Sequence, residues 1–379
     1  MNHAASSAPA SAPDRFEGLG HVPELIRLGR SLRGAALGAL VLGALLLLTG
    51  AGQGGARLWG NLLVAGVNLT HVGLGGLFLV AATRLTNARW SDPILAAPHA
   101  MPRVLPWALG LMLLLWFGAG VLYPWARPEA ASDHLLHLRA AWLNKPFFWG
   151  RIVLYFALWH FLGRLMLRRK AFTAPFMVSF GLTLSLASFD WIMSLEPAWY
   201  STIFAIYGFA GMFLQGIALV SMSAVALRRF GLLPHGIQKS PNHDLGKMLF
   251  AFSAFWAYIW LSQFLLIWYA NIPEEVGPIK VLLSGPWAPL YYLNLALNFV
   301  VPFHLMLNRK AKDLESMMLW AGAVVLAGHW LDLYLLVFPP LTGGAPPRLG
   351  LPEIGGILLT LGLGHLAVWP RLTRMKETV

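Results

Sequence analysis

Two aspartates lie deep inside apolar segments of this chain, where a charge needs a partner or a function. Asp190 occurs in LTLSLASFDWIMSLEP and Asp332 in VVLAGHWLDLYLLVFPP. An ionised carboxylate at the centre of a bilayer costs at least ~2.5–3.5 kcal/mol on insertion scales. All the other acidic residues fall near the ends of apolar segments or between them. The sequence therefore indicates that buried acid is tolerated at two matched places only.

Histidines on neighbouring apolar segments point to proton transfer. Histidine titrates near neutral pH and can pass protons, and burial can raise the pKa of a carboxyl group into the same range. His329 and Asp332 are three residues apart, which puts them on one face of a helix. Glu196, just beyond the helix of Asp190, could pass protons to the outer surface. The predicted proton pathway consists of His71, His160, Asp190, Glu196, His304, His329 and Asp332.

Two other roles for such polar residues compete with a proton pathway. One is a polar pocket for a quinone head group, lined by Asn68, His71 and Asp190. The other is structural, because Ser, Asn, Gln and His side chains often hydrogen-bond between membrane helices. The structural role is favoured for isolated polar residues, namely Gln215, Asn298 and His365. For the two aspartates we favour proton chemistry, because hydrogen bonding between helices does not need a charge.

Haem and metal ligation are less favoured. A haem held by two histidines needs a facing pair at one depth, and His160 and His304 differ in depth. A metal ion usually needs at least three protein ligands, more than His329 and Asp332 supply. The chain has no cysteine, which excludes disulfides and cysteine-ligated iron–sulfur clusters. We therefore expect no catalytic residue, metal ligand or ligated cofactor here, and any redox centre would belong to a partner.

The composition is that of a polytopic membrane protein. The 379 residues are 57% hydrophobic and 12% charged, with a mean hydropathy of +0.62, whereas soluble domains carry about 25% charged residues. A helical span needs ~20 mostly apolar residues. The longest connection, 125–147, contains HLLHLRAAWL, which could form a small interfacial helix. Ten spans, predicting an all-α transmembrane fold, cover 33–50, 58–83, 104–124, 148–168, 173–194, 200–227, 246–270, 284–306, 314–337 and 352–370.

The distribution of basic residues predicts the orientation. With ten spans both termini lie on one side, and that side receives 21 of the 28 Lys and Arg residues. Basic residues favour the cytoplasmic side, so both termini should be cytoplasmic. The same bias explains the formal charge of +12 without nucleic acid as a partner. We expect a disordered cytoplasmic tail at 1–32, a membrane domain at 33–370 and a second cytoplasmic tail at 371–379.

The two aspartate segments belong to a predicted internal repeat. Each follows a helix with one histidine and a basic stop, YFALWHFLGRLMLRRK before Asp190 and LNFVVPFHLMLNRK before Asp332. The separations agree, with 144 residues from His160 to His304 and 142 from Asp190 to Asp332. Copies offset by four spans keep the same orientation and are related by an axis along the membrane normal. We predict two parallel-repeat four-helix bundles, spans two to five (about 58–197) and six to nine (about 200–340), with the first and tenth spans peripheral.

Two stretches carry a resemblance to a known family. They are SFDWIMSLEPAWYSTIFAIYGFAG, around residues 189–210, and HDLGKMLFAFSAFWAYIWLSQFLLIWYANIPEE, at 243–275. With these stretches the chain resembles the second polysulfide-reductase-type (NrfD-like) integral membrane subunit of bacterial alternative complex III, a quinol:cytochrome c oxidoreductase. The ten-span plan of that family covers nearly the whole chain.

The resemblance implies partners in a bacterial cytoplasmic (inner) membrane. They would be a sister NrfD-like subunit, an iron–sulfur subunit and multihaem cytochrome c subunits. Members of the family are commonly described as quinone-binding, so menaquinone or another quinone is the expected small molecule. The clearer quinol pocket belongs to the sister subunit, which leaves this one as a support and a proton path. The rival classes are a secondary transporter, which also suits parallel repeats, and a purely structural membrane anchor.

Overall fold

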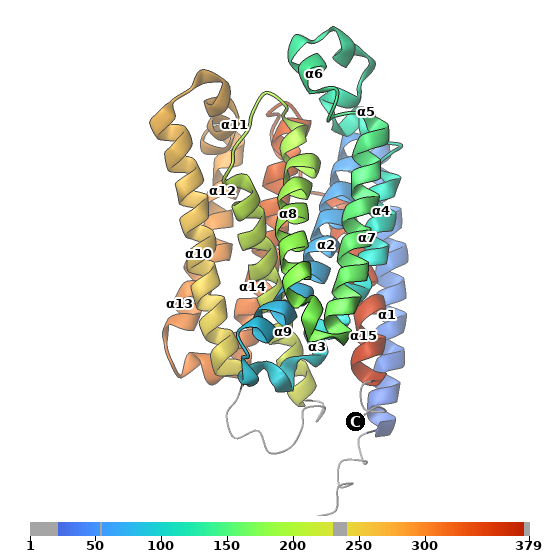
Figure 1. Ribbon diagram of the computed structural model, residues 1–379, viewed down its shortest axis with the longest axis vertical. Helices are drawn as coiled ribbons and strands as arrows, with labels where there is room; N and C mark the ends of the chain where they lie inside the picture. The colour runs from blue at the N-terminus through green and yellow to red at the C-terminus, as the bar shows by residue number, and fades with distance from the viewer. Residues whose placement is uncertain (1–21, 54, 230–240, 375–379) are drawn as a thin grey trace, which may run out of the picture.

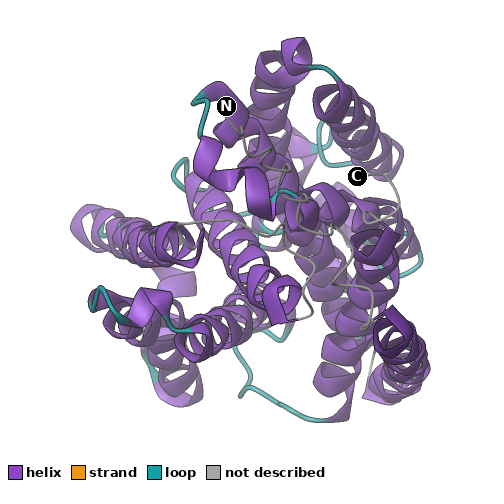
Figure 2. Ribbon diagram, turned by 90° about the horizontal axis from the view of Figure 1, so that it is seen from below, coloured by secondary structure: helices purple, strands orange, loops and turns teal. Residues whose placement is uncertain are grey.

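The computed structural model describes residues 22–53, 55–229 and 241–374, which form a bundle of helices along one long axis (Figure 1). These ranges contain no strand. Seen from one end, many of the helices are viewed close to end on (Figure 2). The long helices are α1 (Val22–Leu48), α2 (Ala56–Leu85), α7 (Lys145–Arg168), α8 (Thr173–Trp191), α9 (Phe204–Arg229), α10 (Pro241–Ala270), α14 (Glu315–Leu341) and α15 (Leu351–Arg374). The shorter ones are α3 (Ala96–Ala100), α4 (Leu105–Leu114), α5 (Ala119–Leu122), α6 (His134–Arg139), α11 (Pro273–Leu283), α12 (Ala288–Leu295) and α13 (Val301–Leu307).

Nine helical segments in the described ranges are long and apolar enough to cross a membrane, which makes the chain a multi-pass membrane protein. The expected third span, 104–124, is not among them. It divides into α4, a turn at 115–118 and α5, so it is not one continuous helix. In that turn an added Cβ on Gly118 would lie 2.1 Å from the Trp59 indole, which shows how tightly the chain bends round this side chain. The expected ten continuous spans are therefore not all found, and the two-bundle repeat stays a prediction.

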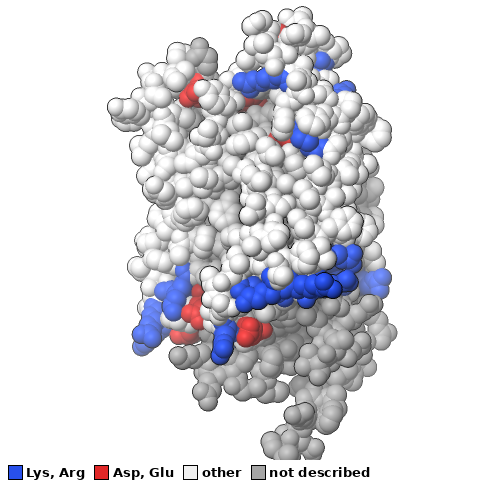
Figure 3. Space-filling model, in the orientation of Figure 1, with Lys and Arg blue, Asp and Glu red and all other residues white. Residues whose placement is uncertain are grey.

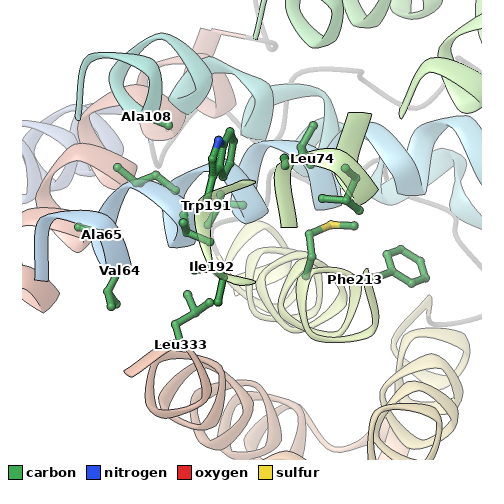
Figure 4. Close-up of a cluster of buried hydrophobic side chains, with 14 of the residues drawn as sticks. Val64, Ala65, Leu74, Ala108, Trp191, Ile192, Phe213 and Leu333 are labelled. Atoms are coloured by element: carbon green, nitrogen blue, oxygen red, sulfur yellow. The ribbon is translucent and has the colours of Figure 1, made fainter. Parts of the chain in front are cut away.

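Helix α2 is the centre of the bundle. In its most apolar stretch 94% of the residues are buried, and it packs against α4, α8, α9, α14 and α15. Figure 4 shows part of this core, with labelled side chains at Val64, Ala65, Leu74, Ala108, Trp191, Ile192, Phe213 and Leu333. Helices α2 and α9 meet where Gly75 faces Gly216, and neither position has space for a Cβ. The helix that carries His71 is therefore surrounded by protein rather than lipid.

Helices α1 and α15 form a pair at one side of the bundle (Figure 1). In their most apolar stretches only 22% and 39% of the residues are buried, so both are peripheral. Their backbones touch at glycines, where small residues let membrane helices approach closely. An added Cβ on Gly355 would lie 2.4 Å from the backbone nitrogen of Leu47, and one on Gly43 would lie 2.6 Å from that of Leu359.

The tails differ from their predicted bounds. Residues 22–32, expected in a disordered tail, form the first turns of α1. Pro23 lies near the first helical position, where a missing N–H costs no hydrogen bond, and this placement favours a helix start. Helix α15 continues to Arg374, four residues beyond its predicted end. The expectations for 1–21 and 375–379 lie outside the described residues.

The two ends of the bundle differ in charge. Lys and Arg form a band across the lower end in Figure 3, which we call the basic end. The opposite end carries α6, and we call it the α6 end (Figure 1). Helix α6 forms within HLLHLRAAWL, where the sequence predicted a small helix, and Asp133 caps it by accepting from the N–H groups of Leu135 and Leu136. The basic band fits the predicted cytoplasmic side, and the orientation itself stays a prediction.

The glycine contact between α1 and α15 gives a first testable prediction. We expect Gly355→Leu to push the two helices apart, because its Cβ would meet backbone atoms that cannot rotate away. The cost should be ~1–3 kcal/mol, as for other overpacked sites, seen as a lower Tm in detergent. Gly38→Leu in α1 is the matched control, since nothing lies within 4 Å of its added Cβ. Equal Tm values for the two variants would contradict the close-packing account.

Candidate functional site

Asp190, at the end of α8, is held in a buried ion pair with Arg151 of α7. The Nε of Arg151 donates to Oδ2 of Asp190, and Nη2 donates to Oδ1, both at 2.8 Å. Tyr155, one turn further along α7, donates its hydroxyl to Oδ2 at 2.9 Å. Trp142 donates its indole N–H to Oδ1 at 2.8 Å. The carboxylate, 1% exposed, is thus matched by a bidentate cation and two further donors.

The segment that follows α6 covers this ion pair. Trp142 offers its indole N–H to Asp190 and its backbone carbonyl to Nη1 of Arg151, at 2.9 Å. The guanidinium carbon of Arg151 also lies 4.1 Å from the Trp142 ring centroid and 4.4 Å from that of Phe147. Aromatic faces stabilise a cation at such distances. The 125–147 connection is therefore a cap on the ion pair.

Asp332, in α14, is equally buried and has different partners. It is 3% exposed, and its Oδ1 accepts from the Tyr207 hydroxyl of α9 and, at 2.8 Å, from the Asn294 amide of α12. Within the described ranges no Arg or Lys pairs with it. The two aspartates that the sequence placed in matched positions therefore differ in charge compensation.

A histidine from α2 meets the histidine that accompanies Asp332. Nδ1 of His71 lies 3.0 Å from Nε2 of His329, so one ring donates a hydrogen bond to the other. Both rings are buried. Two imidazole nitrogens on opposite sides of one metal ion, as in a haem with two histidine ligands, would lie ~4 Å apart, at ~2 Å each. The pair is a direct hydrogen bond and not the facing pair that a haem requires.

Glycine at position 211 opens a small space between His329 and Asp332. An added Cβ on Gly211 would lie 3.1 Å from Nδ1 of His329 and 3.6 Å from Oδ2 of Asp332. That Nδ1 is buried and has no hydrogen-bond partner among the described residues. A cavity of about 20 Å³ borders His71, His329, Asp332, Tyr207 and Ser188, and a water needs roughly 10–15 Å³. One water can therefore bridge His329 and Asp332.

A break in regular helix geometry lies next to Asp332. Between α12 and α13 the chain forms a π turn, Ala296–Val300, a feature frequent at functional sites. Asn298, within it, donates to Oδ1 of Asn294 at 2.7 Å. Its amide fits against Gly328 of α14, where an added Cβ would lie 2.8 Å from Oδ1. The π turn thus extends the polar cluster from Asp332 to Asn294 and Asn298.

One partner of each aspartate occupies a corresponding sequence position. Arg151 and Asn294 are 143 residues apart, as are Tyr155 and Asn298, whereas the histidines further along these helices are 144 apart. The extra residue is the one that a π turn inserts. Arg151 and Asn294 both donate to the aspartate of their own half. At this position the second half has an amide where the first half has a cation, and the repeat itself stays a prediction.

Three predicted pathway residues lie away from both clusters. His160 is partly exposed, and its Nε2 lies 3.1 Å from Nη1 of Arg164 towards the basic end. His304 is exposed, with Nδ1 at 2.7 Å from the Val300 carbonyl oxygen. Glu196 follows the short turn Met193–Leu195 after α8 and is half buried. Burial raises the pKa of the Glu196 carboxyl above its ordinary value. The described contacts join none of the three to Asp190 or Asp332.

A second polar pair lies one turn from His71 and faces a larger cavity. The Nε2 of Gln215 on α9 donates to Oδ1 of Asn68 on α2 at 3.0 Å. Both residues line a cavity of about 540 Å³ between α2, α9, α14 and α15, with mainly apolar walls. The Oε1 of Gln215 and the Nε2 of His365, another lining residue, are buried without a hydrogen-bond partner among the described residues. Of the predicted quinone ligands, Asn68 lines this cavity, His71 lines the smaller one, and Asp190 lines neither.

Sequence reasoning missed the residues that reach the aspartates from other helices. Arg151 is one of them, and it is 4% exposed inside α7. The chain also buries a third acid, Glu353, in the first turn of α15, against the expectation of two. Glu353 pairs with Arg57 and accepts from the Asn61 amide at 3.0 Å. A usable signal for Arg151 was its spacing of 39 residues from Asp190, close to the 38 between Asn294 and Asp332.

No family model matches the chain, and no curated protein sequence matches it. The fold shows the coarse class, a multi-pass helical membrane protein. The resemblance to an NrfD-like subunit and the partners it implies stay predictions.

The Arg151–Asp190 pair gives a prediction about stability. Breaking a buried pair by removing one partner typically costs ~3–5 kcal/mol, because the remaining charge is uncompensated. We therefore expect Arg151→Gln to lower the Tm in detergent strongly, and the double variant Arg151→Gln/Asp190→Asn to recover part of the loss. Asp332→Asn is the control, because no cation is stranded and an amide still accepts from Tyr207. A fall in Tm in Asp332→Asn as large as in Arg151→Gln would refute the difference in charge compensation between the two sites.

Proposed function

We propose that Asp332, His329 and His71 form a proton-exchange site inside the membrane domain. The observation that carries the proposal is the combination of a buried carboxyl without a cation and a histidine pair beside it. A buried, permanently charged carboxylate would need the kind of partner that Asp190 has. A carboxyl that exchanges a proton with neighbouring imidazoles does not, because histidine and aspartate share the charge between them.

The contacts suggest how a proton would move. His71 passes a proton from Nδ1 to Nε2 of His329, 3.0 Å away. His329 releases a proton from Nδ1 to Asp332 through one water in the cavity beside Gly211. The tautomers then reset by ring or water rearrangement. Tyr207 and Asn294 hold the carboxyl in place from the other side.

The second part of the proposal concerns the setting of this site. We place the chain as an integral membrane subunit of a quinol-oxidising respiratory complex, on the resemblance of 189–210 and 243–275 to the second NrfD-like subunit of alternative complex III. The chain has no cysteine, so cysteine-ligated electron carriers would reside on partner subunits. Quinol oxidation releases protons, which gives a buried proton-exchange site a task in such a complex.

The 540 Å³ cavity fits a quinone as its small molecule. Ligand cavities are typically about 300–1,000 Å³, mostly apolar, with a few placed polar groups. Here the unpartnered Oε1 of Gln215 can accept from a hydroxyl, and apolar walls suit a prenyl tail. Asn68 and His71 are three apart on α2, so a head group at the Asn68–Gln215 pair would lie near the start of the proton route.

The proton-exchange proposal predicts a selective loss in Asp332→Asn. In liposomes holding the chain with the subunits that co-purify in mild detergent, we expect proton-coupled quinol oxidation to fall about a hundredfold, as positioned proton-transfer groups typically contribute 10²–10⁴. Infrared difference spectra during turnover should lose a carboxyl band in Asp332→Asn and keep it in Asp190→Asn. Asp244→Asn, on an exposed carboxylate near the start of α10, is the control.

Two results would separate the parts of this proposal. An unchanged carboxyl band in Asp332→Asn would refute the proton-exchange site itself. The alternative result is a chain that purifies alone and moves a solute across liposome membranes while the carboxyl band still depends on Asp332. That result would support the proton-exchange site but favour a secondary transporter over the respiratory complex.

The quinone cavity predicts a change in ligand affinity. We expect Gln215→Leu to weaken binding of a short-tailed menaquinone analogue about tenfold, the effect of one lost hydrogen bond of ~1–1.5 kcal/mol. Quenching of tryptophan fluorescence by the analogue measures the Kd, since Trp330 and Trp369 line the cavity. Gln263→Leu, on α10 and outside the cavity, is the control. Equal affinity in both variants, or binding that does not saturate, would rule out this site.

A further inference from the structure

A third cavity, at the basic end, is lined partly by basic and partly by apolar side chains. Its volume is about 900 Å³, and it lies between α7, α15 and the segment 102–107 that enters α4. Arg103, Arg164 and Arg168 line it together with His99 and His160, and the described residues of its lining include no acidic one. Apolar side chains line the rest, including Leu77, Leu105 and Leu366.

Hydrogen bonds fix the positions of Arg164 and of the helix end that carries Arg168. Nη1 of Arg164 lies 3.1 Å from Nε2 of His160, one turn earlier on α7, which orients the guanidinium along that helix. The last turn of α7 is in turn fastened to α2, because Arg84 donates to the backbone carbonyls of Met166 and Leu167, the latter at 3.0 Å. Arg168, the last residue of α7, is therefore carried on a fixed helix end.

We infer that this cavity binds the phosphate of an anionic membrane phospholipid, with its acyl chains against the apolar wall. Guanidinium groups match phosphate oxygens in charge and geometry. Basic pockets between membrane helices bind anionic headgroups. The cavity lies at the basic end, where Lys and Arg gather (Figure 3), and Trp107, 55% exposed, is among its lining residues, as expected near an interface where lipid headgroups lie. A soluble anion would use the guanidiniums alone and leave the apolar wall in water.

The inference does not rest on the proposed function, because it needs only a chain inserted in a membrane. It assigns a task to His160, which the sequence placed in a proton pathway and the structure places at this cavity. His160 accepts from Arg164 and so acts as a positioning residue for the phosphate ligand.

Native mass spectrometry of the full chain in detergent tests the inference with defined lipids. Cardiolipin, phosphatidylglycerol and phosphatidylethanolamine are titrated separately, each with and without millimolar inorganic phosphate. We expect saturable binding of the two anionic lipids, little binding of phosphatidylethanolamine, and no displacement by inorganic phosphate. The triple variant Arg103→Gln/Arg164→Gln/Arg168→Gln should lose affinity on the order of a hundredfold, at ~1 kcal/mol per basic residue.

The matched control removes the same charge from the same end but outside the cavity. It is Arg169→Gln/Arg309→Gln/Lys310→Gln, and none of these residues lines the cavity. A second variant, Ala367→Trp, fills the cavity without changing charge and should also lower anionic lipid binding. Equal losses in both triple variants, equal binding of all three lipids, displacement by inorganic phosphate, or unchanged binding in Ala367→Trp would each overturn the inference.

Discussion

The cost of burying a carboxylate away from water governs the arrangement of this bundle. An isolated charge in a medium of low polarity needs either an opposite charge with its hydrogen bonds satisfied or a way to become neutral. Around Asp190 the chain meets this requirement with Arg151, two further donors and aromatic faces on the cation. The segment after α6 supplies one of those donors, so even a surface connection is shaped by the buried charge.

Around Asp332 the same requirement is met without a cation. A hydroxyl and an amide bind one carboxyl oxygen, and the other faces the space beside Gly211 and His329. At corresponding sequence positions the first site has an arginine in α7 and the second has an asparagine in α12. The π turn and the close approaches at Gly211 and Gly328 are found only beside the second site within the described ranges.

The sequence predicted what local spacing and composition determine. The membrane class followed from hydrophobic length, and the shared face of His329 and Asp332 followed from a three-residue step on a helix. The partners from other helices did not follow, because contact across a bundle depends on the rotation and depth of each helix. His71 and His329 are 258 residues apart, and nothing local indicates that they touch. Arg151 was not predicted as a partner because a basic residue near a helix end normally reaches the interface, whereas this one binds a buried carboxylate 39 residues later. His160 and His304 were included for being histidines at matched positions, but their helices turn them away from the aspartates.

Helix α2 links the two cavities of the core, and this bears on how they would work together. Asn68 and His71 are one turn apart on it, with the larger cavity at the first and the histidine pair at the second. The buried surroundings of α2 and its glycine contact with α9 leave little freedom for this helix to move. A proton released at the Asn68–Gln215 pair would therefore reach His71 through side-chain and water rearrangement and not through a shift of the backbone. In a rigid core of this kind the step that can be gated is the one across the 20 Å³ cavity, which has room for a single water between an imidazole and a carboxyl group. A larger residue at 211 would enter this space, because an added Cβ on Gly211 would lie 3.1 Å from Nδ1 of His329 and 3.6 Å from Oδ2 of Asp332.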